Sequence, residues 1–78
     1  MMSTIQREYL CNAQKAVRIA SAVKFNNVAY NAQVRWAETY WSTYLKSVGA
    51  KQFQDRIARL RTLLAAKDTA GALKFISC

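Results

Sequence analysis

Hydrophobic side chains recur at three- and four-residue steps over positions 3–24, the spacing that places them on one face of an α-helix. This face consists of Ile5, Tyr9, Ala13, Ala16, Val17, Ala20 and Val23. At the start of the segment, Ser3 and Gln6 have the spacing of a capping box, in which each side chain hydrogen-bonds to the backbone N–H of the other residue. The pattern therefore predicts a first helix over residues 3–24.

A wider apolar face follows over positions 27–48. Its members are Tyr30, Val34, Trp36, Ala37, Tyr40, Trp41, Tyr44, Leu45 and Val48. On a helical wheel they cover about 180°, more than the ~100° that a surface helix needs to meet a core. Asn27 suits the N-cap, because its side-chain oxygen can accept a hydrogen bond from the first turn, and Gly49 suits the left-handed position that ends a helix. We therefore expect a second helix over residues 27–48.

Two shorter amphipathic segments complete the chain. Residues 51–66 carry an apolar stripe made of Phe53, Ile57, Leu60 and Leu64. Asp68 can cap a last helix over residues 69–77, whose apolar members are Ala70, Leu73 and Ile76. Short connections favour antiparallel neighbours. The expected fold class is all-α: a small antiparallel three-helix bundle with a short fourth C-terminal helix that covers it as a lid, in one domain over residues 1–78.

The composition agrees with an all-helical domain. The 78 residues include no proline and only two glycines, the residue types that most disfavour helices. Hydrophobic residues make up 53% of the sequence, which is sufficient for a core. No stretch approaches the ~20 apolar residues of a membrane-spanning helix, and the N-terminus lacks the apolar run of a signal peptide. We therefore expect a cytoplasmic protein without a membrane partner.

The sequence offers little for catalysis or metal binding. Histidine is absent, and Cys11 and Cys78 lie too far apart for the short spacing of a metal site. The acidic residues stand singly on separate segments, as Glu8, Glu38, Asp55 and Asp68. We therefore expect no enzymatic activity, no cofactor and no metal. Free thiols are expected in a reducing compartment, and a Cys11–Cys78 bridge is the alternative.

Charge is the strongest compositional feature, because twelve Lys and Arg residues face four Asp and Glu residues, a net charge of +8. This excess favours an acidic or polyanionic partner, with solubility alone as the alternative. The first candidate partner-binding group is Arg7, Lys15 and Arg18, on the polar face of the first helix around Cys11. The second is Lys51, Arg56, Arg59 and Arg61, followed by Lys67. Arginine suits such a site because its planar fork matches carboxylate and phosphate groups.

Within the second group, Arg59 is expected to point away from the apolar stripe of its helix, with Arg56 at the margin. A third candidate surface is aromatic and consists of Trp36, Tyr40 and Tyr44. Tyrosine and tryptophan dominate protein interfaces together with arginine. The alternative is that the neighbouring helices bury these rings. Because the aromatic arc is wider than a three-helix core requires, we expect a homodimer, with a monomer as the alternative.

These features predict a small basic interaction protein. We expect an inhibitor or regulator, of the general character found in phages and mobile elements, that docks on an acidic surface of a larger protein or nucleoprotein. The alternative is direct nucleic-acid binding, since residues 41–61 have the outline of a helix-turn-helix with its turn at Gly49. Asp55, however, occupies a position where that motif has an apolar residue. The basic residues also lie on every helix rather than on one surface, which favours a protein partner.

Overall fold

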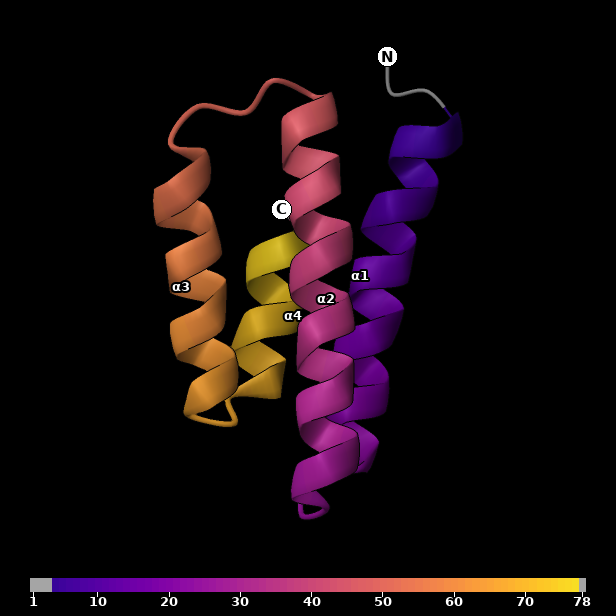
Figure 1. Ribbon diagram of the computed structural model, residues 1–78, viewed down its shortest axis with the longest axis vertical. Helices are drawn as coiled ribbons and strands as arrows, with labels where there is room; N and C mark the ends of the chain where they lie inside the picture. The colour runs from indigo at the N-terminus through magenta and orange to yellow at the C-terminus, as the bar shows by residue number, and fades with distance from the viewer. Residues whose placement is uncertain (1–3, 78) are drawn as a thin grey trace.

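The computed structural model describes residues 4–77 and contains four helices (Figure 1). They are α1 (Thr4–Ala22), α2 (Asn27–Ser47), α3 (Phe53–Ala65) and α4 (Thr69–Ser77). No strand occurs within this described range, so the all-α expectation is confirmed. The predicted helix boundaries in this range lie within two residues of the observed ones, because each helix is set by a local apolar period and by local end residues.

The helices follow one another up and down, and each packs mainly against two others (Figure 1). α1 and α2 form a long hairpin, and α3 returns beside α2. α4 then lies between α3 and α1 and packs on both. The arrangement therefore differs from the expected bundle with a lid, since α4 is one of the four walls around the core.

The N-cap of α2 is Asn26 rather than the predicted Asn27. Asn26 has an extended backbone, with φ −99° and ψ 98°, and its Oδ1 accepts a hydrogen bond of 3.2 Å from the Ala29 N–H. The predicted capping box at the start of α1 includes Ser3, which lies outside the described residues. Its partner Gln6 donates from Nε2 to the Ser47 carbonyl oxygen over 3.0 Å, and so ties the start of α1 to the end of α2.

Gly49 ends α2 in the left-handed conformation, with φ 64°, as predicted. The Gly49 N–H donates to the Lys46 carbonyl over 3.2 Å, and the Ala50 N–H donates to the Leu45 carbonyl over 3.0 Å. This pair of bonds is the Schellman motif, which satisfies carbonyls at the helix end. Gly49 is suited to this position because a residue without Cβ adopts positive φ at little cost.

The same motif ends α3, but the left-handed residue there is Lys67, with φ 59°. The Lys67 N–H donates to the Leu64 carbonyl over 3.0 Å, and the Asp68 N–H donates to the Leu63 carbonyl over 2.9 Å. The Lys67 side chain crosses to the α1–α2 connection, where Nζ donates to the Lys24 carbonyl (2.8 Å). The Lys67 side chain thus links the α3–α4 turn to the α1–α2 connection.

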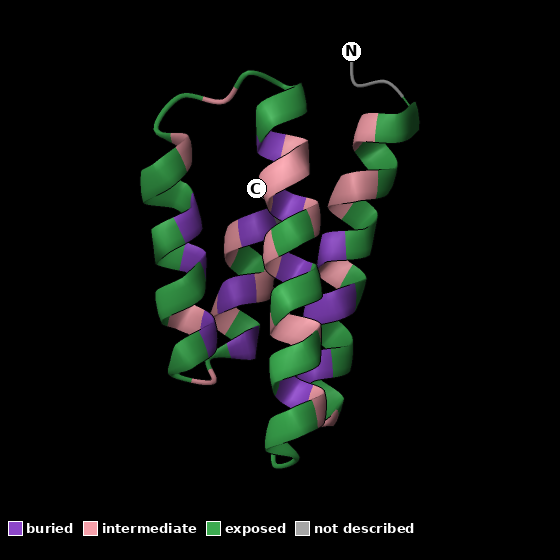
Figure 2. Ribbon diagram, in the orientation of Figure 1, coloured by how far each residue is buried: buried purple, intermediate pink, exposed green. Residues whose placement is uncertain are grey.

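Figure 2 shows the buried residues on the faces that the four helices turn toward one another. The core consists of Ala13, Ala16, Val17, Ala37, Trp41, Leu45, Ile57, Leu60, Leu64, Ala72 and Ile76. Small alanine side chains on α1 and α2 line the contact between these two helices. Trp41 packs edge-on against Phe75 of α4, with ring centroids 5.2 Å apart. Four members of the predicted apolar faces are exposed. Ile5 and Ala70 lie in the first turns of α1 and α4, Val48 follows the end of α2, and Trp36 lies at the margin of the wide α2 face.

Candidate partner-binding groove

A groove of about 960 Å³ is lined by residues of all four helices and of the α2–α3 connection. α4 is shorter than the helix beside it. At 1.5 Å per residue, its nine residues extend for about 14 Å, against about 20 Å for the 13 residues of α3.

The floor of the groove is apolar and comes from three helices. It consists of Leu10 from α1, Trp41, Tyr44 and Leu45 from α2, Val48 just after α2, and Phe75 from α4. Trp41 and Leu45 are core residues, so the floor is continuous with the hydrophobic core. Tyr44 and Phe75 are only half-buried, which leaves aromatic surface for a ligand to cover.

One wall of the groove carries Arg56 and Arg59, which lie one turn apart on α3. Both side chains are exposed. The Arg59 guanidinium carbon lies 5.8 Å from the ring centroid of Phe75, in cation–π contact across the α3–α4 junction. Arg59 lies outside the core stripe of α3, as predicted. It is nevertheless directed toward a neighbouring helix. Its guanidinium group faces α4.

Lys74 of α4 lines the same groove and was missed by sequence reasoning. It stands alone in an apolar segment, so nothing local marks it as part of a basic group. Only the position of α4 beside α3 brings it near the two arginines. The sequence pattern could have identified it if α4 had been recognised as a neighbour of α3.

Two carboxylates also line the groove, Asp55 and Asp68. Asp55 is in the first turn of α3. Asp68 caps α4, where its Oδ1 accepts a hydrogen bond of 2.9 Å from the Gly71 N–H. Each acid thus lies at a helix N-terminus, where a partial positive charge of about half a unit offsets its own charge. The groove lining thus carries three cationic and two acidic side chains.

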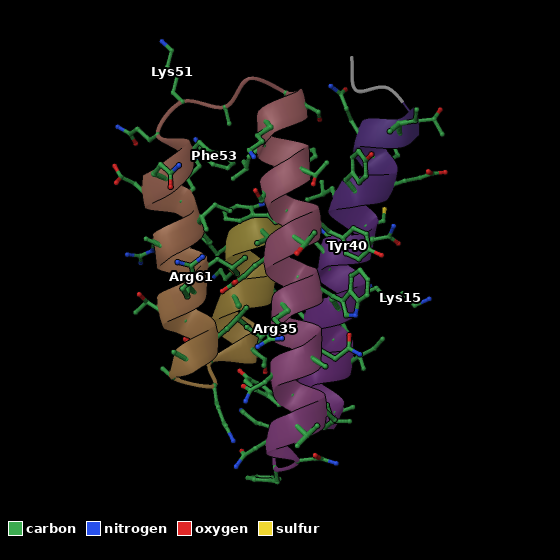
Figure 3. All side chains as sticks on the ribbon, viewed as in Figure 1. Lys15, Arg35, Tyr40, Lys51, Phe53 and Arg61 are labelled. Carbon is green, nitrogen blue, oxygen red and sulfur yellow. The ribbon has the colours of Figure 1, made fainter. Side chains whose placement is uncertain are left out.

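The remaining members of the predicted cluster lie elsewhere. Arg61 is on the α2-facing side of α3, where its Nε lies 3.1 Å from Oε1 of Glu38 in an ion pair. Lys51 extends away from the bundle at the α2–α3 connection (Figure 3). The three arginines predicted together are therefore divided, because a spacing of five residues between Arg56 and Arg61 places them on different sides of a helix.

The basic group on α1 is solvent-exposed and separate from the groove. Arg7, Lys15 and Arg18 are all exposed, and Lys15 points away from the bundle (Figure 3). Cys11, between them, is exposed. Its alternative pairing with Cys78 lies outside the described residues.

The predicted aromatic surface is also divided. Trp36 and Tyr40 stack with ring centroids 5.5 Å apart and an interplanar angle of 22°. They line a shallow hollow of about 260 Å³ against α1, beside Lys15 and Ile19. Trp36 remains 53% exposed. Tyr44 belongs instead to the groove floor.

The predicted helix-turn-helix outline takes a different geometry. α2 and α3 lie side by side and antiparallel (Figure 1), whereas the helices of that motif cross at about 90–120°. Residues 41–61 thus form part of a helical hairpin.

Among the described residues, no group of three or more His, Cys, Asp or Glu side chains is placed to hold a metal ion. No helix in this part of the chain is long and apolar enough to cross a membrane.

The arrangement can bind a partner that presents both carboxylate and apolar groups. Guanidinium groups donate paired hydrogen bonds to carboxylates, and the aromatic floor beside them supplies hydrophobic contact area. Comparison with known proteins finds no matching family model, no matching curated protein and no matching solved structure, so no relative assigns a ligand to the groove.

Proposed function

We propose that the protein is a non-enzymatic interaction module, an inhibitor or regulator, that binds an acidic surface of a larger protein or nucleoprotein through the groove. The observation that carries this proposal is the position of Arg56 and Arg59 above an apolar floor. Neither arginine forms an ion pair with a described residue. Both are therefore available to a carboxylate of another molecule.

Physical chemistry favours this wall over the other basic surfaces. The energy of an interface is concentrated in a few central residues, most often tryptophan, tyrosine and arginine, next to surface that becomes fully desolvated on binding. Arg59 in contact with Phe75, and Arg56 lining the same groove as Tyr44 and Leu45, provide that combination. Arg7, Lys15 and Arg18 lie along an exposed face of α1 and do not line the groove.

Capture of a partner from a lysate of the native host tests the proposal. The immobilised wild-type protein is compared with Arg56→Glu/Arg59→Glu and with Arg7→Glu/Arg18→Glu. The second variant is the matched control, because it makes the same change of charge on exposed residues of α1. We expect a protein partner that resists nuclease treatment, is retained by the α1 variant and is lost by the groove variant.

Circular dichroism of both variants checks that the helices persist. The groove variant also loses the Arg59–Phe75 contact, which is worth about 0.5–1 kcal/mol at an exposed site. Equal capture by the wild type and the groove variant would contradict the proposal. Capture that disappears on nuclease treatment would instead favour direct nucleic-acid binding.

A further inference from the structure

A second basic surface lies along the contact between α2 and α3, and none of its residues lines the groove. Four residues of α2 follow one another at steps of three or four and therefore share one face of the helix: Arg35, Glu38, Ser42 and Lys46. Two contacts place this face beside α3. Glu38 is ion-paired with Arg61, and the Lys46 ammonium lies 5.4 Å from the ring centroid of Phe53.

The cations along this contact form an elongated row, which we call the α2–α3 stripe: Arg35, Lys46, Lys51 and Arg61. All four side chains are exposed. Figure 3 shows Arg35 on α2, Arg61 on α3 and Lys51 at the connection between the two helices. Arg35 and Lys46 are eleven residues apart, which corresponds to about 16 Å along the helix axis. The stripe thus repeats positive charge over three turns of α2.

Acidic side chains offset little of this charge. Of the four acidic residues in the chain, Glu38 is the one on this face, and it is paired with Arg61. The other three are on α1 or line the groove. The remaining members of the stripe form no ion pair with a described residue. Three cations are therefore available to an anionic ligand.

The stripe lacks the apolar centre of a protein interface. Between Arg35 and Lys46, the large apolar residue that α2 exposes is Trp36, which lines the hollow against α1. Phe53 is half-buried and lies against the Lys46 ammonium. Protein interfaces have an aromatic and apolar core, and single-stranded nucleic acids bind through exposed rings that stack on bases. A row of phosphates requires only spaced cations.

We propose that the α2–α3 stripe binds the phosphate backbone of double-stranded nucleic acid without reading its sequence. Each strand of a duplex carries one phosphate per about 3.4 Å of helix axis, so the length from Arg35 to Lys46 spans about five phosphates. This inference is independent of the proposed function, because it concerns a different face. In a nucleoprotein, the groove would contact the protein and the stripe would contact the nucleic acid.

Fluorescence anisotropy with labelled DNA duplexes of two unrelated sequences, measured over a range of salt concentrations, tests the stripe. The stripe variant is Arg35→Gln/Lys46→Gln. The matched control is the groove variant Arg56→Gln/Arg59→Gln. Each pair removes two positive charges, and in each pair one cation lies against an aromatic ring and the other does not. Circular dichroism checks that both variants remain helical.

We expect the wild-type protein to bind both duplexes with equal affinity. The stripe variant should bind at least about tenfold more weakly, and the slope of log K against log salt should shrink by about two, one unit for each lost phosphate contact. The groove variant should change this slope by less than about one unit, because its arginines do not belong to the stripe.

Glu38→Gln tests the stripe in the opposite direction. It removes the acid on this face and releases Arg61 from its ion pair. We expect tighter binding to the duplexes and a slope that is steeper by about one unit, because one more cation can contact a phosphate. Glu8→Gln is the matched control, since it removes the same charge from α1 and should leave the slope unchanged.

Equal losses of affinity in the stripe and groove variants would overturn the inference, because binding would then depend on net charge alone. So would an unchanged affinity of Glu38→Gln, or tighter binding of a single-stranded oligonucleotide than of a duplex. If vesicles of anionic phospholipid bind the protein and duplexes do not, the stripe contacts a membrane surface and the inference is wrong. Capture of a protein through Arg56 and Arg59 is measured separately, so failure of duplex binding leaves the proposed function standing.

Discussion

The ammonium group of Lys67 donates a hydrogen bond of 2.8 Å to the main-chain carbonyl oxygen of Lys24. It also lies 3.3 Å from Oδ1 of Asn27 and 5.2 Å from the ring centroid of Tyr30. One side chain thus joins the α3–α4 turn to the α1–α2 turn. Because its backbone has φ 59°, the residue contributes these contacts from a conformation that L-residues rarely adopt.

Lys67→Met should destabilise the fold by about 1–3 kcal/mol, since a hydrogen bond from a charged donor is lost while the apolar stem is kept. Urea unfolding measures the change. Lys51→Met is the control, because Lys51 is exposed on the α2–α3 connection and its loss should cost less than about 0.5 kcal/mol. Lys67→Gly should be less harmful than Lys67→Met, because glycine relieves the left-handed backbone. Equal losses at positions 51 and 67 would contradict the assigned contact.

Gly71→Ala should not stabilise α4, although alanine usually favours a helix over glycine by about 1 kcal/mol. A Cβ at this position would meet the Asp68 carboxylate, which caps the helix by accepting from the Gly71 N–H. In an Asp68→Ala background the obstacle is gone, and Gly71→Ala should stabilise by about 0.5–1 kcal/mol. Thermal unfolding of the two single variants and the double variant gives the coupling. If the stability changes of the two single variants add up to that of the double variant, the Asp68 cap does not restrict position 71.

The buried phenol of Tyr30 should make the fold less stable at alkaline pH. Its hydroxyl donates to the Leu64 carbonyl over 2.5 Å, and burial raises the pKa of the phenol above its ordinary value of 10.0. The folded state therefore holds this proton more tightly than the unfolded state does. The resulting stability is fully present below pH 10 and is lost as pH rises through the folded pKa.

Tyr30→Phe measures this effect, because it removes the titrating group and keeps the ring. Near pH 8 the variant should be less stable by about 1–3 kcal/mol, since the Leu64 carbonyl loses a buried partner. Above pH 10 the difference between parent and variant should shrink. The Lys67 ammonium lies over the same ring, so the Lys67→Met variant serves as a second background. A constant difference across pH would show that the phenol titrates equally in both states.

Leu60→Ala should cost about 2–5 kcal/mol, because Leu60 is fully buried in the core stripe of α3. Leu63→Ala is the matched control on the same helix. Leu63 is half-buried and borders the groove, so its loss should cost less. The free energy of unfolding in urea ranks the two. A larger cost at Leu63 would mean that α3 is rotated about its axis relative to the packing described above.

Self-association through the Trp36–Tyr40 stack remains a prediction. Trp36 is 53% exposed and Ile19 is 39% exposed on the same side of the α1–α2 hairpin. We expect light scattering of the wild-type protein at micromolar concentration to give twice the chain mass of 8.9 kDa. For Trp36→Ser we expect the mass of a single chain. A wild-type mass of 8.9 kDa would show that this surface does not join two copies.

The helices were predictable because their determinants are local. The apolar repeat identifies each face, and Gly49 and Asp68 mark ends by their backbone and side-chain preferences. Asn26 and Asn27 were indistinguishable as caps, since either side chain can accept from the next turn. In the structure Asn26 caps α2, while the Asn27 side chain accepts a hydrogen bond from Lys67, forty residues later.

The groove was only partly predictable. Arg56 and Arg59 stood out as basic residues on α3, but their separation from Arg61 depends on which flank of α3 meets α4. That is a tertiary relationship, and a helical wheel of one segment does not contain it. Lys67 resembled a surface lysine, because a left-handed position occupied by a residue other than glycine has no recognisable pattern in the sequence.

The short length of α4 has a consequence for local opening. An isolated helix of nine residues is marginal in water, so α4 persists through its contacts with α1 and α3, the Asp68 cap and the packing of Phe75 on Trp41. Its amide hydrogens should therefore exchange with solvent sooner than those of α2, through excursions in which α4 detaches and the core remains. Phe75 and Lys74 leave the groove in such an excursion. A ligand that contacts both α3 and α4 binds only when α4 is docked, so its binding stabilises the docked state. Slower hydrogen exchange at the amides of α4 alone would therefore indicate that such a ligand has bound.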